Sequence, residues 1–154
     1  MKMSVNILIL LLLNFGALAI GGLFTGDGVA SDWYSELDKA PWTPTGWVFG
    51  AAWTTIMICF TFYMGILLRR AKTKQKVRSL YILQLVLNIT WNPIFFYYQF
   101  PSIALVVIIT LTLLIFYFIL NYRKTLGWYS ILIVPYVVWL CIATSLNLYI
   151  LMSN

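Results

Sequence analysis

Residues 41–53 read PWTPTGWVFGAAW, with three tryptophans and two prolines at the point where a polar, acidic segment gives way to apolar sequence. Proline lacks an N–H group and suits the first turn of a helix, so Pro44 predicts a helix start. Indole rings are typical of the water-facing end of a membrane helix, and Trp42 and Trp47 are equally well explained as bilayer anchors. Trp53 lies about two helical turns further in, too deep for such an anchor, and is a candidate for lining a pocket.

The composition excludes a water-soluble globular fold. The 154 residues are 62% hydrophobic and 9% charged, with a mean hydropathy of +0.91, which indicates an integral membrane protein. The sequence contains no histidine, so the commonest general base and metal ligand is missing, and neither a metal nor a required cofactor is expected. The net charge of +6 does not indicate nucleic acid, because nine of the ten cations adjoin apolar spans, where membrane topology explains them.

Five apolar stretches have about the length needed to cross a hydrocarbon core of roughly 30 Å. They predict an all-α integral membrane protein, a five-transmembrane-helix bundle that forms one domain over residues 1–154. In and just after the first stretch, the pairs Ala17/Gly21 and Gly22/Gly26 are spaced for close helix packing. The predicted spans are residues 5–24, 45–68, 79–98, 102–121 and 128–152, with a lid loop at residues 25–43.

The charges predict the orientation of the spans. Lys2, the six cations within residues 69–78 and the pair Arg123-Lys124 fall on one side, which places the N-terminus inside and the C-terminus outside. The lid loop falls on the opposite side and carries all four acids of the chain. Because every charged residue lies outside the spans, an ion-coupled transporter is disfavoured. The acids are Asp27, Asp32, Glu36 and Asp38.

Amide side chains recur along the third predicted span. Gln84, Asn88 and Asn92 follow one another at intervals of four, with Trp91 and Phe95 on the same helical face. Amides within a bilayer are costly unless they are paired, so this stripe must face protein or a cavity.

Aromatic side chains from three spans and from the lid loop could form one pocket. Trp53, Trp91, Phe95 and Trp139 offer π-faces, and Asn88 offers directional hydrogen bonds, which suits a flat, hydrophobic, aromatic ligand such as a porphyrin. The alternative is that these rings only pack the helices together. Pro135 is expected to kink the last span, Ala143 leaves room beside an indole, and two loop aromatics are expected to fold back over the helix ends. The candidate ligand-binding residues are Trp33, Tyr34, Trp53, Asn88, Trp91, Phe95, Trp139, Ala143 and Leu146.

Three segments together resemble the TspO/MBR family, the translocator proteins also called tryptophan-rich sensory proteins or peripheral benzodiazepine receptors. The resemblance covers almost the whole chain, and the order of the segments on a chain of this length makes it specific. The segments are Trp42-x-Pro44-x-x-Trp47-x-Phe49-Gly50-x-x-Trp53-Thr54, then Gln84-Leu85-x-Leu87-Asn88-x-x-Trp91 with Phe95-Phe96, and Pro135-Tyr136-x-x-Trp139-x-x-x-Ala143-x-x-Leu146-Asn147.

The resemblance implies a clockwise five-helix bundle, a homodimer in the bilayer of a bacterial cell membrane, with a pocket beneath the first loop. The implied ligands are porphyrins and hydrophobic drugs of the isoquinoline or benzodiazepine type. A light- and oxygen-dependent porphyrin degradation is also implied, with porphyrin as substrate and Trp53 and Trp139 as the catalytic candidates, whereas hydrolytic or metal-dependent activity is not. The alternative function is transport of porphyrin or a sterol-like lipid across or within the membrane.

The sequence departs from the family pattern at several positions. Thr45 stands where a second proline is common, Ala51 where proline often follows the glycine, and Met57 where tyrosine is frequent. The first two departures concern the geometry with which the second span begins. No lysine or arginine follows Tyr149, so the sterol motif near the end of the last span is missing.

Overall fold

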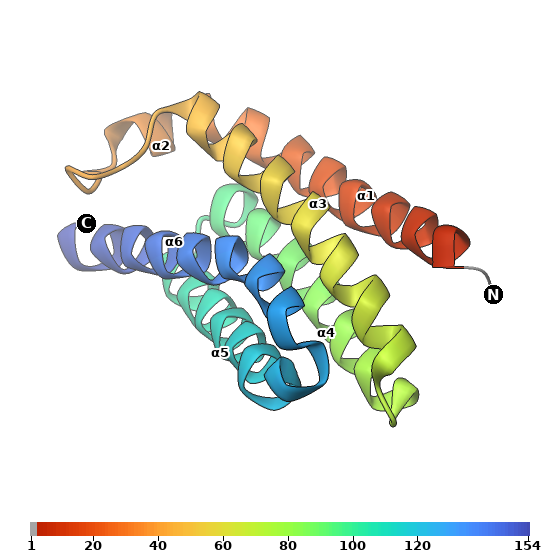
Figure 1. Ribbon diagram of the computed structural model, residues 1–154. Coiled ribbons are helices and arrows are strands. Elements are labelled where there is room, and N and C mark those ends of the chain that lie inside the picture. The colour runs from red at the N-terminus through yellow and green to blue at the C-terminus, as the bar shows by residue number, and fades with distance from the viewer. Residues whose placement is uncertain (1–2) are drawn as a thin grey trace.

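The computed structural model describes residues 3–154, and the side chains of residues 6–154. Its described part is helical, with no strand (Figure 1). Lys2, on which the orientation argument partly depends, lies outside the described residues. The elements are α1 (Met3–Val29), α2 (Asp32–Glu36), α3 (Gly46–Arg70), α4 (Lys74–Asn92), the π-helical η1 (Pro93–Tyr97), α5 (Pro101–Leu126), the 3-10 helical η2 (Gly127–Ile133) and α6 (Val134–Ser153).

Four helical stretches are long and apolar enough to cross a membrane. The last of them, Pro101–Ser153, is 53 residues long because α5, η2 and α6 follow one another directly, and it folds back so that α5 and α6 lie side by side (Figure 1). Helices satisfy their backbone hydrogen bonds internally, and this is required in a bilayer because lipid tails offer no hydrogen-bonding partner. The prediction of an all-helical membrane protein is therefore confirmed.

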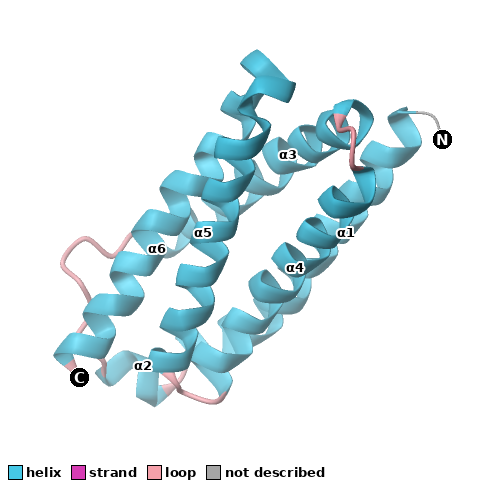
Figure 2. Cartoon of the chain, turned by 90° about the horizontal axis from the view of Figure 1, so that it is seen from below, coloured by secondary structure: helices cyan, strands magenta, loops and turns pink. Residues whose placement is uncertain are grey.

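The five long helices form a ring. α1 contacts α3 and α4, α4 contacts α5, α5 contacts α6, and α6 contacts α3. Figure 2 shows α1 beside α4 and α5 beside α6. Phe60, Tyr63 and Phe118 fill the centre of the ring and are fully buried. The Tyr63 hydroxyl donates a hydrogen bond to the Phe118 carbonyl oxygen at 3.1 Å, so this buried phenol has a hydrogen-bond partner.

α1 continues five residues beyond the predicted span, so the segment that precedes α3 begins at residue 30 and not at residue 25. The predicted lid loop began at Thr25, but packing keeps residues 25–29 helical. Thr25 Oγ1 donates to Asn92 Oδ1 at 2.7 Å, and Gly21 lies so close to Asn92 that an added Cβ would stand 2.6 Å from its Nδ2 atom. Gly28 lies equally tightly against the Phe96 side chain.

The pair Ala17/Gly21 lies at a helix contact, as its spacing suggested. Both residues are buried, and Gly21 faces α4. The second small pair, Gly22/Gly26, is exposed, and a Cβ at either glycine would meet nothing within 4 Å. Spacing alone does not show which of two overlapping small pairs faces a neighbouring helix.

α4 begins at Lys74, within the basic segment, and not at residue 79 as predicted. Lysine, glutamine and arginine are good helix formers, so a charged first turn at the water end costs little. At the other end, Pro93 interrupts the regular pattern, because it has no N–H to donate. The Tyr98 N–H donates to the Pro93 carbonyl at 2.9 Å across five residues, so the helix ends as the π-helical η1.

α5 extends past Arg123 to Leu126, five residues beyond the prediction, and ends where Gly127 adopts φ +57°. Glycine has no Cβ and tolerates this backbone conformation, which permits the turn into η2. The predicted span of residues 128–152 is therefore not one α-helix, because its first residues form the 3-10 segment. Pro135 is the second residue of α6 and not a kink in the middle of a helix.

Candidate functional site

The segment between α1 and α3 is an ordered structure built around α2. Ser31 caps α2, since its Oγ accepts a hydrogen bond from the Tyr34 N–H at 3.2 Å. The Lys39 ammonium donates to the Ser35 and Leu37 carbonyls at 3.3 and 3.2 Å and lies 4.8 Å from the centre of the Tyr34 ring. Burial raises the pKa of the Tyr34 phenol, so this ring stays neutral where it packs.

This segment is fastened to the end of α6. The Asp38 N–H donates to Asn154 Oδ1 at 2.9 Å, and Asn154 Nδ2 donates to the Asp38 carbonyl at 3.3 Å. Further along, the Trp42 indole N–H donates to Ser145 Oγ at 3.2 Å. Trp42 therefore holds the segment against α6, whereas Trp47 is 76% exposed.

The structure brings five rings together where α2 packs against η1 and the end of α4, and we call them the loop cluster. Trp33 packs edge-on against Phe95 with ring centres 5.7 Å apart, and Phe95 stacks on Trp91 at 5.0 Å. Tyr34 packs on Phe96 at 5.6 Å. The two loop aromatics thus fold back over the helix ends, as the sequence suggested.

A second group of rings, the α3–α6 cluster, contains the two tryptophans proposed for photochemistry. Trp53 and Trp139 have ring centres 6.5 Å apart at an interplanar angle of 75°. Phe49 packs edge-on against Trp139 at 5.1 Å, and Trp53 packs against Tyr136 at 6.0 Å. The aromatic residues of the predicted site therefore fall into two ring clusters and not into one.

Trp91 connects the two clusters, because it packs against the hydrophobic residues of both. Its indole N–H donates to Asn147 Oδ1 at 3.1 Å, and Asn147 Nδ2 donates to the Pro101 carbonyl at 2.9 Å. Leu146 is buried and Ala143 is half-buried on the same helix, with Ala143 packed at the edge of the core.

The amide stripe of α4 faces protein on two sides. Gln84 Nε2 donates to the Tyr136 hydroxyl of α6 at 2.7 Å, while Asn92 turns towards α1. Asn88 lies between them and is 7% exposed, yet its side-chain amide makes no hydrogen bond with any described residue. The Gln84 Oε1 atom is fully buried without a partner among these residues, whereas the Asn88 amide atoms are not fully buried. The Asn88 amide is therefore accessible to a ligand's polar group.

Sequence reasoning missed a buried polar network on the other side of the bundle. Asn14 of α1 is fully buried, donates from Nδ2 to Thr61 Oγ1 at 2.8 Å and accepts from the Tyr81 hydroxyl at 2.8 Å. The network joins α1, α3 and α4. One asparagine in the middle of a long apolar run was the signal that could have revealed it.

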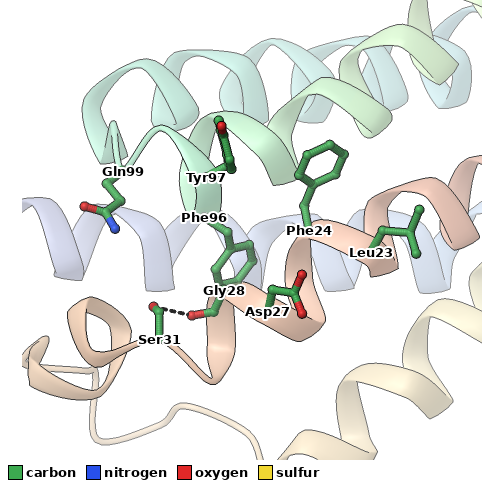
Figure 3. A pocket seen from close by; sticks show the side chains of 8 residues that line it. All are labelled: Leu23, Phe24, Asp27, Gly28, Ser31, Phe96, Tyr97 and Gln99. Atoms are coloured by element: carbon green, nitrogen blue, oxygen red, sulfur yellow. Dashed lines mark hydrogen bonds between the residues drawn. The ribbon is translucent and has the colours of Figure 1, made fainter.

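Two cavities open at the surface near these clusters. The α1–η1 cavity, of about 420 Å³, lies between the end of α1 and the segment that follows α4, and Figure 3 shows its lining side chains. The α3–α6 groove, of about 440 Å³, is lined almost entirely by apolar side chains. Of the nine candidate ligand-binding residues, Trp139 lines the α3–α6 groove and none lines the α1–η1 cavity.

Comparison with known proteins identifies relatives over nearly the whole chain. The family model of the TspO/MBR family matches residues 8–152. A tryptophan-rich protein TspO of Archaeoglobus fulgidus is 33% identical over 162 aligned residues, covering 100% of this chain and 97% of the relative. A tryptophan-rich sensory protein of Cereibacter sphaeroides is 31% identical, covering 75% of this chain and 73% of the relative.

The similarity extends to a human translocator protein, which is 30% identical over 83% of this chain and 78% of its own length. The tryptophan positions that carried the resemblance all lie within the matched residues. The all-helical membrane fold, the ordered aromatic segment before α3 and the match over residues 8–152 together establish that this chain belongs to the TspO/MBR family.

Proposed function

We propose that the protein is a membrane receptor for a flat, hydrophobic, aromatic ligand, with porphyrin as the best fit and isoquinoline- or benzodiazepine-type compounds as further ligands. Relatives named sensory and translocator proteins support a receptor or transporter role in the membrane. The ligand would lie beneath α2, between the loop cluster and the α3–α6 cluster.

Asn88 is the observation on which this proposal depends. The residue is 7% exposed and lies one helical turn before Trp91 in sequence, and its side-chain amide has no hydrogen-bond partner among the described residues. A porphyrin complements both kinds of side chain at this site. Its flat faces suit the indole and phenyl rings, and its polar groups suit the amide.

Ligand binding requires the two rings of α2, Trp33 and Tyr34, to move. Trp33 and Tyr34 pack directly on Phe95 and Phe96, so a ligand would replace these contacts with its own. The segment that carries α2 is short, and its hydrogen bonds to the described part of α6 are made by two residues, Asp38 and Trp42. We therefore assign it the role of a lid that opens for the ligand.

The proposal includes five membrane crossings, with the N-terminus inside and the C-terminus outside, and a homodimer. The basic residues at the end of α3, at the start of α4 and at the end of α5 support one inner face. The acidic segment around α2 would then face outside, in a bacterial cell membrane.

Transport of porphyrin or a sterol-like lipid is the second candidate function, and the α3–α6 groove is the observation that favours it. The groove has an apolar lining and reaches Trp139, a member of the proposed site. An apolar molecule could move along it between the site and the bilayer. The absence of a basic residue after Tyr149 gives a sterol less support than a porphyrin.

Adding protoporphyrin to the purified protein, first in the dark and then in light, tests the proposal. Binding alone quenches tryptophan fluorescence in the dark and leaves the porphyrin spectrum intact. Degradation bleaches the main porphyrin absorption band in light when oxygen is present. Net movement of porphyrin into protein-containing vesicles, compared with protein-free vesicles, would favour transport. No saturable response in any of the three assays would contradict the proposal.

A further inference from the structure

The α1–η1 cavity is built by close contacts between two elements. Gly28 packs against Phe96, which draws the end of α1 onto η1, and the Ser31 hydroxyl donates to the Gly28 carbonyl at 2.6 Å. On the far side, Gln99 adopts φ +56°, a conformation that few residues other than glycine tolerate. Figure 3 shows Phe24 of α1 pointing towards the segment that carries Tyr97, and Asp27 beside it on α1.

One carboxylate lines the cavity. The Asp27 carboxylate makes no hydrogen bond or ion pair with any described residue, although it lies beside polar neighbours. The nearest cation in sequence, Lys39, donates its ammonium hydrogens to backbone carbonyls of the lid. The negative charge of Asp27 is therefore not neutralised by the described chain, and a bound cation would neutralise it.

Two aromatic rings flank the same cavity. Phe24 and Tyr97 pack edge-to-face with ring centres 6.4 Å apart. The faces of aromatic rings attract organic cations, and proteins commonly bind quaternary ammonium groups between aromatic rings. Rings beside a carboxylate favour an organic ammonium ion over a bare metal ion, which would need several oxygen ligands.

The surroundings of the cavity suit an amphiphile. Leu23 lines the cavity and is 72% exposed, and Ile20 and Leu12 continue the exposed apolar face of α1. Tyr97 is 70% exposed, as expected of a ring at the level of lipid headgroups. We propose that the α1–η1 cavity binds the ammonium group of an amphiphile whose apolar tail lies along α1, at a site that adjoins the proposed porphyrin site at Phe96.

The test compares ligands that share a dodecyl tail. Protein in dodecyl maltoside, a neutral detergent, is titrated with dodecyltrimethylammonium or dodecylphosphocholine at low salt, and bound ligand is counted by native mass spectrometry. Comparable affinity for the cationic trimethylammonium head and the zwitterionic phosphocholine head would indicate a phospholipid headgroup as the source. Tighter binding of the simple ammonium would indicate a free cationic amphiphile, because Asp27 repels phosphate.

Matched variants distinguish binding at this cavity from a general effect of surface charge on ammonium binding. Asp27→Asn should weaken ammonium binding about fivefold, the effect of one exposed ion pair, and added salt should weaken the wild type in the same way. Asp32→Asn, an exposed acid outside the cavity, should bind as wild type does. Tyr97→Leu should weaken binding, and Tyr98→Leu, its exposed neighbour outside the cavity, should not.

Three results would overturn the proposal. They are wild-type affinity in Asp27→Asn, equal losses in the Asp27→Asn and Asp32→Asn variants, and equal losses in the two tyrosine variants. Protoporphyrin binding should be unchanged in Asp27→Asn, so failure of this proposal and failure of the proposed porphyrin function are distinguishable.

Discussion

Two asparagines, Asn147 and Asn88, have similar burial but opposite roles. Asn147 is 2% exposed, and its side-chain amide makes hydrogen bonds with both the Trp91 indole N–H and the Pro101 carbonyl. Asn88 is 7% exposed, and its side-chain amide makes no hydrogen bond with any described residue. The sequence predicts that both amides avoid lipid, but it does not reveal which has a partner, because partners come from helices distant in sequence. Only the unpartnered amide is free to bind a ligand.

Replacing Asn88 should affect binding and not folding. Asn88→Leu removes an amide without a described partner and suits an apolar helix, so thermal stability in detergent should hold while porphyrin affinity falls roughly tenfold. Asn147→Leu is the matched control and should lower stability by about 2 kcal/mol, because it leaves the Trp91 N–H and the Pro101 carbonyl unpaired. Loss of folded protein in Asn88→Leu would mean that Asn88 joins helices.

Replacing the paired tryptophans separates binding from photochemistry. Phenylalanine keeps a π-face and much of the apolar contact, but it is far harder to oxidise than indole. Trp139→Phe should therefore bind porphyrin within a few-fold of wild type and lose most of the light-dependent bleaching, measured as the decay of the main absorption band. Trp53→Phe tests the neighbouring ring. Undiminished bleaching in the double variant would remove both indoles from the chemistry.

Lys39 should act through the lid and not through ligand charge. Its ammonium caps the carbonyl end of α2 and covers the Tyr34 ring, so Lys39→Met should loosen the lid. Affinity for protoporphyrin and for an uncharged isoquinoline ligand should then change by the same factor in equilibrium binding assays. A loss restricted to protoporphyrin would instead show that Lys39 pairs with a porphyrin carboxylate.

At the scale of elements, the sequence predicts where helices exist better than where they end. Apolar length locates every long helix, because the bilayer allows little else. The ends depend on contacts that no local pattern contains. Residues 25–29 stay helical because Gly21 and Gly28 fit against Asn92 and Phe96. In the same way, the rings of the candidate site could be named in advance, but their division into two clusters follows from how the helices pack.

The close contact of α1 with η1 predicts opposite effects for neighbouring glycines. Gly28→Ala should destabilise the protein by about 1–3 kcal/mol, because its Cβ would overlap the Phe96 side chain. Gly26→Ala, whose Cβ would meet nothing within 4 Å, should be neutral or raise stability by up to about 1 kcal/mol through better helix propensity. Thermal unfolding in detergent measures both changes. Equal effects of the two substitutions would contradict this packing.

At the scale of the whole molecule, the distribution of charge orients the bundle in the membrane. Arg69, Arg70, Arg123 and Lys124 lie in the last turns of α3 and α5, next to the basic start of α4. The acids of α2 lie at the other end of α3, beyond its first residue. Because cations favour the inner side, this separation supports an orientation with α2 outside.

Labelling single cysteines tests this orientation. In a background where Cys59 and Cys141 are replaced by alanine, Glu36→Cys should react with a membrane-impermeant maleimide on intact cells. Lys74→Cys should react only after the membrane is permeabilised. Both positions are exposed in the fold, so the difference reports the side of the membrane and not burial. The reverse pattern would invert the proposed topology.

The hydrogen bonds between Asp38 and Asn154 have a practical consequence for purification. They place residue 154 against the backbone of the lid. An affinity tag fused directly after this residue would begin where the lid closes, and could shift a measured dissociation constant without touching the pocket. A tag attached before α1 is separated from the lid by the length of that helix. Ligand affinities are therefore best compared between proteins tagged at the amino end.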